Sequence, residues 1–386
     1  MIKTQAWVLE AAKDDPQGSP AGKLQQQVYT FSDLAEHEVL AEPIYGSWEG
    51  NMSHAIKREP VDICRQREEE RVVIGNAGVV RVLKVGESVK TIKENDLCIV
   101  FCNGVSDRLG YPAKIYAYDA PGTVGLLAKQ TKLHERQLIP VPHNTRHGLK
   151  HWAAFSLRYV TAWANWKIAY GCWQLQSAGN ASLTPFVWGW GGGVTLAELL
   201  LAKLSGCETA MISSLDERLK LIESLGIVPI DRRAFYDLKF DQEKYRCEPE
   251  FRKKYLAAES AFLEIVEEQT HGQGVSIFVD FIGLPVFRAT LKSLGRPAVV
   301  TTAGWKDGMN LSTVRAIECM NWHVHVHTHY ARYEEALEAV SFAEERGWMP
   351  PLDDRVYDWE SIPQLAEAYA AGEISTYFPI FQINSP

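Results

Sequence analysis

The sequence lacks the closely spaced cysteine pairs that a four-cysteine structural zinc site would need. It has 386 residues and seven cysteines, an odd number, and no two of them form a C-x-x-C pair. A four-cysteine zinc site is therefore excluded, and we expect buried free thiols instead. The seven are Cys64, Cys98, Cys102, Cys172, Cys207, Cys247 and Cys319.

Long apolar runs and basic tracts are also missing. No run approaches the roughly 18 apolar residues of a membrane span, and the N-terminal stretch has no apolar core of signal-peptide length. The net charge is −8 and the pI about 5.8, with scattered basic residues. This balance argues against nucleic-acid binding, and we expect a soluble, cytoplasmic protein.

The length is typical of two domains, and the two parts of the chain have different patterns. The first 150 residues are dense in short strands and turns, such as VVIGNAGVVRVLKVGESV at 72–89, which is typical of a small barrel. From Lys150 onward, strands alternate with helices in the βαβ rhythm of a doubly wound parallel sheet. A charged, aromatic-rich segment at 232–262 is longer than an ordinary connection, and we interpret it as a helical insertion.

A glycine cluster joins an apolar strand to a helix in FVWGWGGGVTLAELL, which begins at Phe186. Glycines allow a pyrophosphate to approach the backbone, and the helix N-terminus supplies free N–H groups. A second strand follows about 20 residues later, as in dinucleotide-binding folds. The pattern therefore predicts nucleotide binding, although Trp190 and Thr195 occupy places where small residues are expected.

The end of that second strand predicts which cofactor is bound. An acidic residue there would accept the ribose hydroxyls of NAD. This chain has Ser213 and Ser214, with Arg218 in the next helix, and these donors suit the 2′-phosphate of NADPH. Asp216 lies close enough to leave NADH open as an alternative.

Histidines alternate along a further expected strand at 323–329. Strand alternation would put His323, His325, His327 and His329 on one face. They could bind a metal there, or they could be packed and hydrogen-bonded structural residues.

Taken together and in order, these motifs resemble the medium-chain dehydrogenase/reductases. The resemblance starts at KTQAWVLEAA and runs through EHEVLAEPIYGSWEGNMSH, the 72–89 segment and AAFSLRYVTAWANW to the glycine cluster. It implies a GroES-like β-barrel domain at 1–155 and 330–386, and a Rossmann domain at 156–329. It also implies hydride transfer from a nicotinamide cofactor and a homodimer or tetramer.

The residues argue against the catalytic zinc of this family's alcohol dehydrogenases. Those enzymes have a cysteine at the position of Glu49, and Gly-His-Glu where this chain has Gly75-Asn76-Ala77. With two usual ligands missing, three protein ligands cannot be assembled, and we predict no metal.

Among zinc-free members, the chain most resembles crotonyl-CoA carboxylase/reductases. EGNMSH, IYAYDAPG and MNWHVHVHTHYARYEEA resemble their active-site segments and identify Asn51, Tyr118, Asp119 and His329 as candidate catalytic residues. Each of these four residues could instead have a purely structural role, in packing or hydrogen bonding within the fold. The candidate cofactor-binding residues are Thr161, Trp190, Gly191, Gly192, Gly193, Val194, Ser213, Ser214, Arg218 and Gly304.

The resulting hypothesis is an NADPH-dependent reductase of an α,β-unsaturated acyl thioester, carried by CoA or a carrier protein. Hydride would reach the β-carbon, and the α-carbon would take a proton or carbon dioxide. One alternative is an alcohol dehydrogenase acting on a specialised metabolite, with or without zinc. Another is a degenerate, non-catalytic member of the family that acts as a partner protein.

Overall fold

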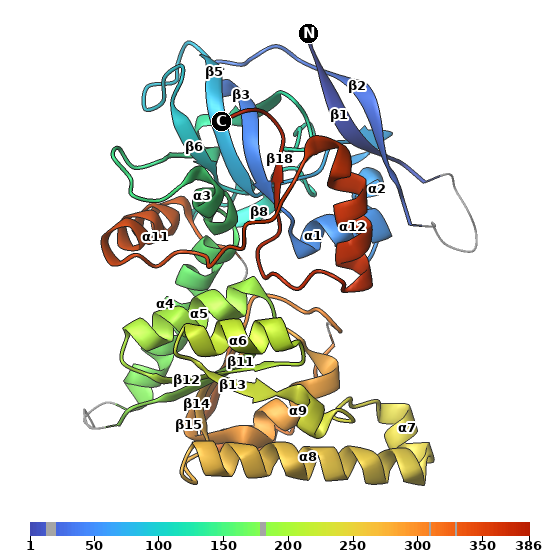
Figure 1. Ribbon diagram of the computed structural model, residues 1–386, viewed down its shortest axis with the longest axis vertical. Coiled ribbons are helices and arrows are strands. Elements are labelled where there is room, and N and C mark those ends of the chain that lie inside the picture. The colour runs from blue at the N-terminus through green and yellow to red at the C-terminus, as the bar shows by residue number, and fades with distance from the viewer. Residues whose placement is uncertain (13–20, 178–182, 309, 329) are drawn as a thin grey trace. The chain divides into compact units, whose positions relative to one another are not determined.

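The computed structural model describes residues 1–12, 21–177, 183–308, 310–328 and 330–386. The chain divides into two compact units: a first unit of Met1–Val160 with Ala331–Pro386, and a second unit of Thr161–Tyr330. Figure 1 shows the elements of each. Among the helices of the described ranges, none combines the length and apolar character needed to cross a bilayer.

The first unit is built on a mostly antiparallel sheet with the strand order β10-β6-β5-β3-β18-β17, in which β9 also pairs with β3. Its C-terminal strand β18 lies antiparallel to β3, so the end of the chain completes a sheet begun near its start. The strands are β3 (Glu38–Ser47), β5 (Gly78–Val85), β6 (Leu97–Val100), β9 (Thr131–His134), β10 (Leu138–Pro140), β17 (Val356–Tyr357) and β18 (Ile380–Gln382).

Two smaller sheets and several helices complete this unit. One sheet has the order β2-β1-β4 and the other pairs β7 with β8. The strands are β1 (Ile2–Glu10), β2 (Leu24–Phe31), β4 (Arg71–Val72), β7 (Asn103–Ser106) and β8 (Pro112–Ile115). The helices are α1 (Gly50–Lys57), α2 (Ile63–Arg67), α3 (Leu149–Phe155), α11 (Tyr333–Arg346) and α12 (Ile362–Ala371), with short 3-10 turns η1 (Glu135–Gln137) and η3 (Trp359–Ser361).

The second unit is a six-stranded parallel sheet in the order β13-β12-β11-β14-β15-β16. This is the strand order of a doubly wound dinucleotide-binding sheet, in which the first strand is central and later strands are added first on one side of it and then on the other. The strands are β11 (Phe186–Trp190), β12 (Glu208–Ser213), β13 (Val228–Asp231), β14 (Val275–Asp280), β15 (Leu294–Thr302) and β16 (His323–His327).

Helices cover both faces of the parallel sheet, as Figure 1 shows, with α5 and α6 on one face and α8 on the other. The segment interpreted as an insertion supplies η2, α7 and α8, and Phe262 of α8 belongs to the same buried cluster as Trp188 and Trp190. The helices are α4 (Arg158–Gln176), which begins in the first unit, α5 (Gly193–Leu204), α6 (Asp216–Ser224), η2 (Arg232–Phe235), α7 (Gln242–Cys247), α8 (Pro249–Gln269), α9 (Leu284–Ser293) and α10 (Arg315–Asn321).

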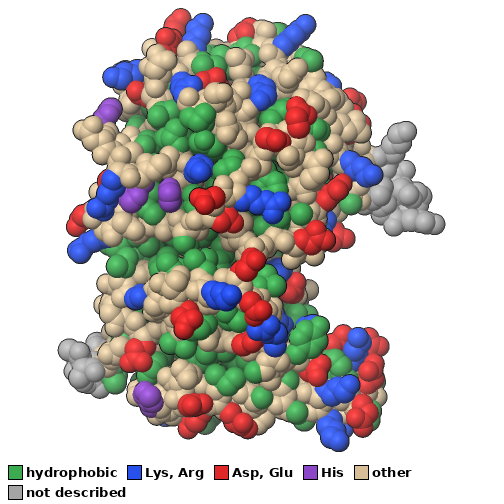
Figure 2. All heavy atoms as spheres, in the orientation of Figure 1, with side chains coloured by type: hydrophobic (Ala, Val, Ile, Leu, Met, Phe, Trp, Pro, Cys, Tyr) green, Lys and Arg blue, Asp and Glu red, His purple; other side chains and the backbone are tan. Residues whose placement is uncertain are grey.

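Charged side chains of the described residues are interspersed by sign on the face drawn in Figure 2. Over α8, for example, basic residues at 252–254 are followed by acidic residues at 259, 264, 267 and 268. A surface of this kind does not concentrate positive potential over a wide area, in agreement with the overall charge of −8.

Candidate functional site

The candidate cofactor residues of the second unit gather at the carboxyl edge of its parallel sheet. Trp190, the last residue of β11, pairs in register with Ile212 of β12 and Asp280 of β14. Ser213 ends β12, and Gly304 follows β15. In doubly wound sheets this edge, beside the first strand, is where ligands bind.

The Trp190 indole does not lie in the glycine turn. It is buried, with its ring centroid 5.2 Å from those of Phe262 and Phe278. Because strand side chains alternate between faces, Gly189 lies on the opposite face, where a Cβ would come within 2.6 Å of Thr195 Cγ2. The large residue therefore fills the α8 side of β11, and the missing side chain lets α5 approach its other side.

The turn itself closes tightly on α5. Gly191 has a φ of +155°, and a Cβ there would lie 2.2 Å from Thr195 Oγ1. Gly192 is the N-cap residue of α5, and Gly193 and Val194 form its first turn. The backbone of this turn and the helix N-terminus are the groups that a pyrophosphate needs.

Polar groups cluster at the end of β12, the place that selects the cofactor in dinucleotide-binding sheets of this kind. Ser213 is nearly buried and Ser214 is exposed, and Arg218 is half-buried on α6. Asp216, which left NADH open, is engaged by Arg233: Arg233 Nη2 donates to Asp216 Oδ1 at 2.6 Å and binds Asp231 as well. This ion pairing offsets the negative charge that would repel a 2′-phosphate.

Two further candidates of this unit have structural contacts. Thr161 is buried in α4. Gly304 is held by Thr302, whose hydroxyl donates to Gly304 O at 2.7 Å and accepts from Gly304 N–H at 3.1 Å. His329 lies outside the described residues.

Neighbouring histidines of β16 share one acidic partner. Glu318 Oε2 lies 3.0 Å from His323 Nδ1 and 2.8 Å from His325 Nε2. The His325 and His327 rings stack with centroids 6.3 Å apart. Over the described ranges, no group of three or more potential ligand side chains is arranged to hold a metal ion.

The remaining candidates lie in the first unit. Asn51 is in the first turn of α1. Asp119 Oδ1 accepts a 2.5 Å hydrogen bond from Ile115 N–H, so this carboxylate closes the turn after β8. Tyr118 is partly buried and packs against a buried hydrophobic cluster that includes Met52 of α1. Burial, with a contribution from Asp119, raises the pKa of Tyr118 to about 12.

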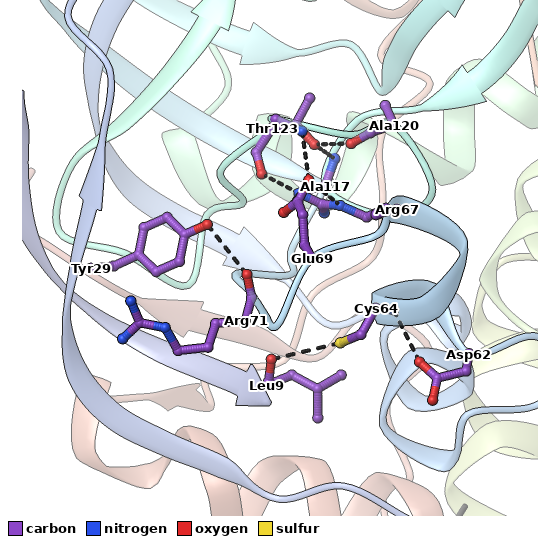
Figure 3. A network of polar contacts seen from close by, with 11 residues as sticks. Leu9, Tyr29, Asp62, Cys64, Arg67, Glu69, Arg71, Ala117, Ala120 and Thr123 are labelled. Atoms are coloured by element: carbon purple, nitrogen blue, oxygen red, sulfur yellow. Dashed lines mark hydrogen bonds and ion pairs between the residues drawn. The ribbon is translucent and has the colours of Figure 1, made fainter. Parts of the chain in front are cut away.

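A network of polar contacts, drawn in Figure 3, anchors the turn that carries Tyr118 and Asp119. Arg67 Nη2 donates to Thr123 O at 2.7 Å and pairs with Glu69 at 2.8 Å. Glu69 in turn accepts from Gly122 N–H at 2.7 Å. The Arg67 side chain is fully buried, so this charged group fixes the turn against the end of α2 rather than meeting solvent.

Close to α1 lies a set of buried side chains that we call the polar cluster: Ser47, Glu49, Cys102 and Arg158, with Asn76 in the neighbouring chain segment. Glu49 Oε1 lies 2.8 Å from Arg158 Nη1, and both side chains are about 5% exposed. Arg158 also donates to Ser47 Oγ at 2.7 Å and to Trp48 O at 2.6 Å. Ser47 N–H donates to Ala77 O at 2.9 Å, which brings Asn76 next to this chain segment.

Burial dominates the electrostatics of this cluster. It raises the pKa of Glu49 to about 7, although Arg158 and Ser47 act in the opposite direction. Burial likewise raises the pKa of the Cys102 thiol to about 12, and the Glu49 charge contributes to that rise. The thiol is therefore neutral at physiological pH, and the charged form of Glu49 is disfavoured relative to an exposed carboxylate.

The polar cluster does not fit a catalytic zinc ion. Glu49, at the position of the family's cysteine ligand, is already paired with the Arg158 guanidinium, and Asn76 offers an amide in place of an imidazole. A cation placed beside Arg158 would be repelled, and three ligands are not assembled.

The sequence reasoning considered Glu49 and Asn76 only as lost zinc ligands, and it missed Arg158. Two signals were available. Arg158 is the single charged residue between His151 and Lys167 in an otherwise apolar helical pattern. Glu49 stands at a helix N-cap, but its carboxylate makes no capping hydrogen bond and is free to pair elsewhere.

No protein-family model and no curated protein matches this chain, but solved structures do. It is similar to a crotonyl-CoA carboxylase/reductase, with 21% identity and a TM-score of 0.80 over 100% of this chain and 89% of that chain. It is also similar to the 2-octenoyl-CoA carboxylase reductase CinF, solved with NADP and 2-octenoyl-CoA, with 17% identity and a TM-score of 0.77 over 98% and 87%. The chain has the medium-chain dehydrogenase/reductase fold. A third structure with this fold is CAD from Helicobacter pylori, complexed with NADP(H), with 14% identity and a TM-score of 0.73 over 100% and 99%.

The medium-chain dehydrogenase/reductase fold confirms the predicted fold class. The parallel six-stranded sheet is the Rossmann part that the glycine cluster and the βαβ rhythm predicted. The mostly antiparallel sheet of the first unit corresponds to the predicted GroES-like part, and the closing strand β18 comes from the C-terminal tail.

Proposed function

We propose that this protein is an NADPH-dependent reductase of α,β-unsaturated acyl thioesters. The observation that carries the proposal is the Gly191–Gly193 turn at the carboxyl edge of a six-stranded parallel sheet, with α5 beginning at the turn. Similarity to crotonyl-CoA and 2-octenoyl-CoA carboxylase reductases over almost the whole chain supports the thioester class. The proposal covers the thioester class, and assays with different acyl chains and carriers would identify the substrate within it.

Named residues have distinct roles in the proposal. The backbone of Gly192 and Gly193 at the α5 N-terminus would hold the pyrophosphate. Ser213, Ser214 and Arg218 would hold the 2′-phosphate, since Arg233 neutralises Asp216. NADPH, when bound, supplies hydride for the β-carbon of the substrate.

At the α-carbon, the chain has to manage a proton or carbon dioxide. We propose that Asn51, Tyr118, Asp119 and His329 serve this step, as the resemblance implies. The Tyr118 hydroxyl stays protonated at neutral pH because burial raises its pKa to about 12, so it would act as a hydrogen-bond donor. Asp119 already accepts from Ile115 N–H, which fixes its carboxylate while leaving its other oxygen for a ligand.

The first test is titration of the purified protein with NADPH and NADH, followed by tryptophan quenching and nicotinamide emission. We expect NADPH to bind more tightly. Replacing Arg218 by Ala should weaken NADPH binding about 10- to 100-fold, the effect of one charge-assisted phosphate contact, and leave NADH binding unchanged. Lys220→Ala on the same helix is the matched control, with both affinities unchanged.

Turnover then tests the reaction class. NADPH oxidation with crotonyl-CoA, measured with and without bicarbonate, separates reduction from reductive carboxylation. Preference for NADH together with oxidation of alcohols would favour the alcohol dehydrogenase alternative. Failure to bind either nucleotide would refute the enzyme proposal and favour the non-catalytic alternative.

A further inference from the structure

One buried amide in the second unit joins α4 to three other elements of that unit. Asn165 of α4 is fully buried, and its Nδ2 donates to both carboxyl oxygens of Glu198 on α5, at 2.9 and 3.0 Å. Its Oδ1 accepts from Thr301 Oγ1 of β15 at 2.9 Å and from Thr328 Oγ1, directly after β16, at 2.5 Å. We call these four residues the Asn165 network.

The Asn165 network is an expensive way to pack two helices together. Glu198 is fully buried, and burial raises the pKa of its carboxyl group well above the usual range, which favours the neutral acid. Replacing both partners of a buried polar pair by apolar groups of the same shape is often neutral for stability, or favourable. What a satisfied polar network adds is directional, because it specifies one arrangement of the elements that it joins.

Those elements carry the candidate cofactor residues of the second unit. Glu198 lies in the first half of α5, the helix that begins at the Gly191–Gly193 turn. β15 ends at Thr302, whose hydroxyl donates to Gly304 O at 2.7 Å. Thr328 N–H donates to Thr302 O at 3.1 Å, so the chain after β16 is fixed at the same point. The network therefore sets where the glycine turn stands relative to the Gly304 turn.

We propose that Asn165 is a positioning residue for the nucleotide site, which holds the glycine turn and the Gly304 turn in the arrangement that NADPH binds. This inference rests on the proposed function and gives a role to residues outside the candidate cofactor set. Asn165 does not contact the cofactor, because its amide is fully buried and both of its polar atoms have partners within the chain.

The expected effect is one of pre-organisation. When only a fraction of the molecules has the binding-competent arrangement, the apparent affinity for the ligand falls by that fraction. Loss of the network should therefore weaken nucleotide binding in a protein that is still folded. NADPH and NADH should weaken alike, because the network includes none of the residues proposed to hold the 2′-phosphate.

The main variant is the double substitution Asn165→Leu with Glu198→Met, which replaces the amide and the acid together by apolar side chains of similar size. The Kd values of NADPH and NADH are measured by nicotinamide emission, under conditions in which urea unfolding shows each variant to be folded. We expect both Kd values to rise about tenfold, as they would if a tenth of the molecules kept the arrangement.

Two single variants accompany it. Glu198→Gln has the shape of the neutral acid and keeps an acceptor for Asn165 Nδ2, so it should bind NADPH with an affinity close to that of wild type. Thr328→Val removes one partly buried hydroxyl and serves if the double variant does not fold. It should weaken both nucleotides about threefold, the lower end of what one hydrogen bond contributes.

Glu259→Gln is the matched control, because it alters a second buried polar network of the same unit. Glu259 is 3% exposed and joins α8 to α9, accepting from Arg288 Nε at 3.1 Å and from Lys292 Nζ at 2.5 Å. The substitution should lower the free energy of unfolding and leave both Kd values unchanged, whereas an equal loss of affinity here would overturn the inference.

Two further outcomes would overturn the inference while the proposed function stands. One is wild-type affinity in the folded double variant, or in Thr328→Val if only that variant folds. The other is a loss of NADPH binding with NADH binding unchanged, which is the signature of a 2′-phosphate contact. A wild-type protein that binds neither nucleotide would instead overturn the proposed function, and this inference with it.

Discussion

Replacing Glu49 by Gln should remove a specific pH dependence from the stability of the first unit. The carboxyl pKa is raised from 4.5 to about 7 because burial disfavours the charged form more than Arg158 favours it. The folded state therefore holds this proton more tightly than the unfolded chain does. The contribution of Glu49 to the free energy of unfolding is therefore greatest below pH 4.5 and is lost as the pH rises through 7. A carboxylate whose pKa is lowered by folding has the opposite pH dependence.

The magnitude follows from the two pKa values. At about 1.4 kcal/mol for each pH unit between them, ionising Glu49 in the folded protein costs about 3 kcal/mol. Of the groups that act on Glu49, Ser47 carries no charge, and burial raises the pKa of the Cys102 thiol to about 12, above this range. Wild type should therefore lose about 3 kcal/mol relative to Glu49→Gln between pH 4.5 and 8.

Hydrogen exchange of the backbone amides of β3 and β5 is the assay of choice, because it reports on the first unit separately from the parallel sheet. Comparison of wild type with Glu49→Gln at each pH cancels the titration of all other groups. Parallel stability profiles would refute the reasoning. A wild-type protein that gains stability relative to the variant as the pH rises would show that attraction by Arg158 outweighs burial.

Two substitutions test the packing of the glycine turn. Trp190→Ala should destabilise the second unit by about 3–5 kcal/mol, the cost of truncating a buried aromatic side chain, as measured by urea unfolding; a loss below about 1 kcal/mol would contradict the packing of its indole on Phe262 and Phe278. Gly191→Ala should destabilise by about 1–3 kcal/mol and weaken NADPH binding, because its φ of +155° disfavours a side chain and its Cβ would meet Thr195. Gly192→Ala is its control for stability, since nothing lies within 4 Å of a Cβ there, and equal losses in both would refute this explanation.

Sequence patterns predicted the first strand of the second unit, the glycine turn after it and the strand that follows, for a physical reason. Strands of a parallel sheet are buried on both faces and appear as short apolar runs, and glycines mark where the first strand turns into its helix. The carboxyl ends of parallel strands lie at one edge of the sheet. Residues that directly follow the apolar strand segments are therefore expected at that same edge. Ser213, Gly191 and Gly304 follow this rule.

Tertiary structure alone decided three other features. A strand buried on both faces accepts an apolar residue on either, so the packing of Trp190 on Phe262 of α8 and Phe278 of β14 is decided only in the folded chain. Choice of ion-pair partner depends on chain segments that meet only after folding, which is why Asp216 is bound by Arg233 and Glu49 by Arg158. The sequence by itself determined that this part of the chain alternates strands and helices and where its glycine turn lies, because these depend on local periodicity. The polar cluster depends on the closure of β3 onto the Asn76 segment and on the helix that carries Arg158, and only the folded chain brings these together.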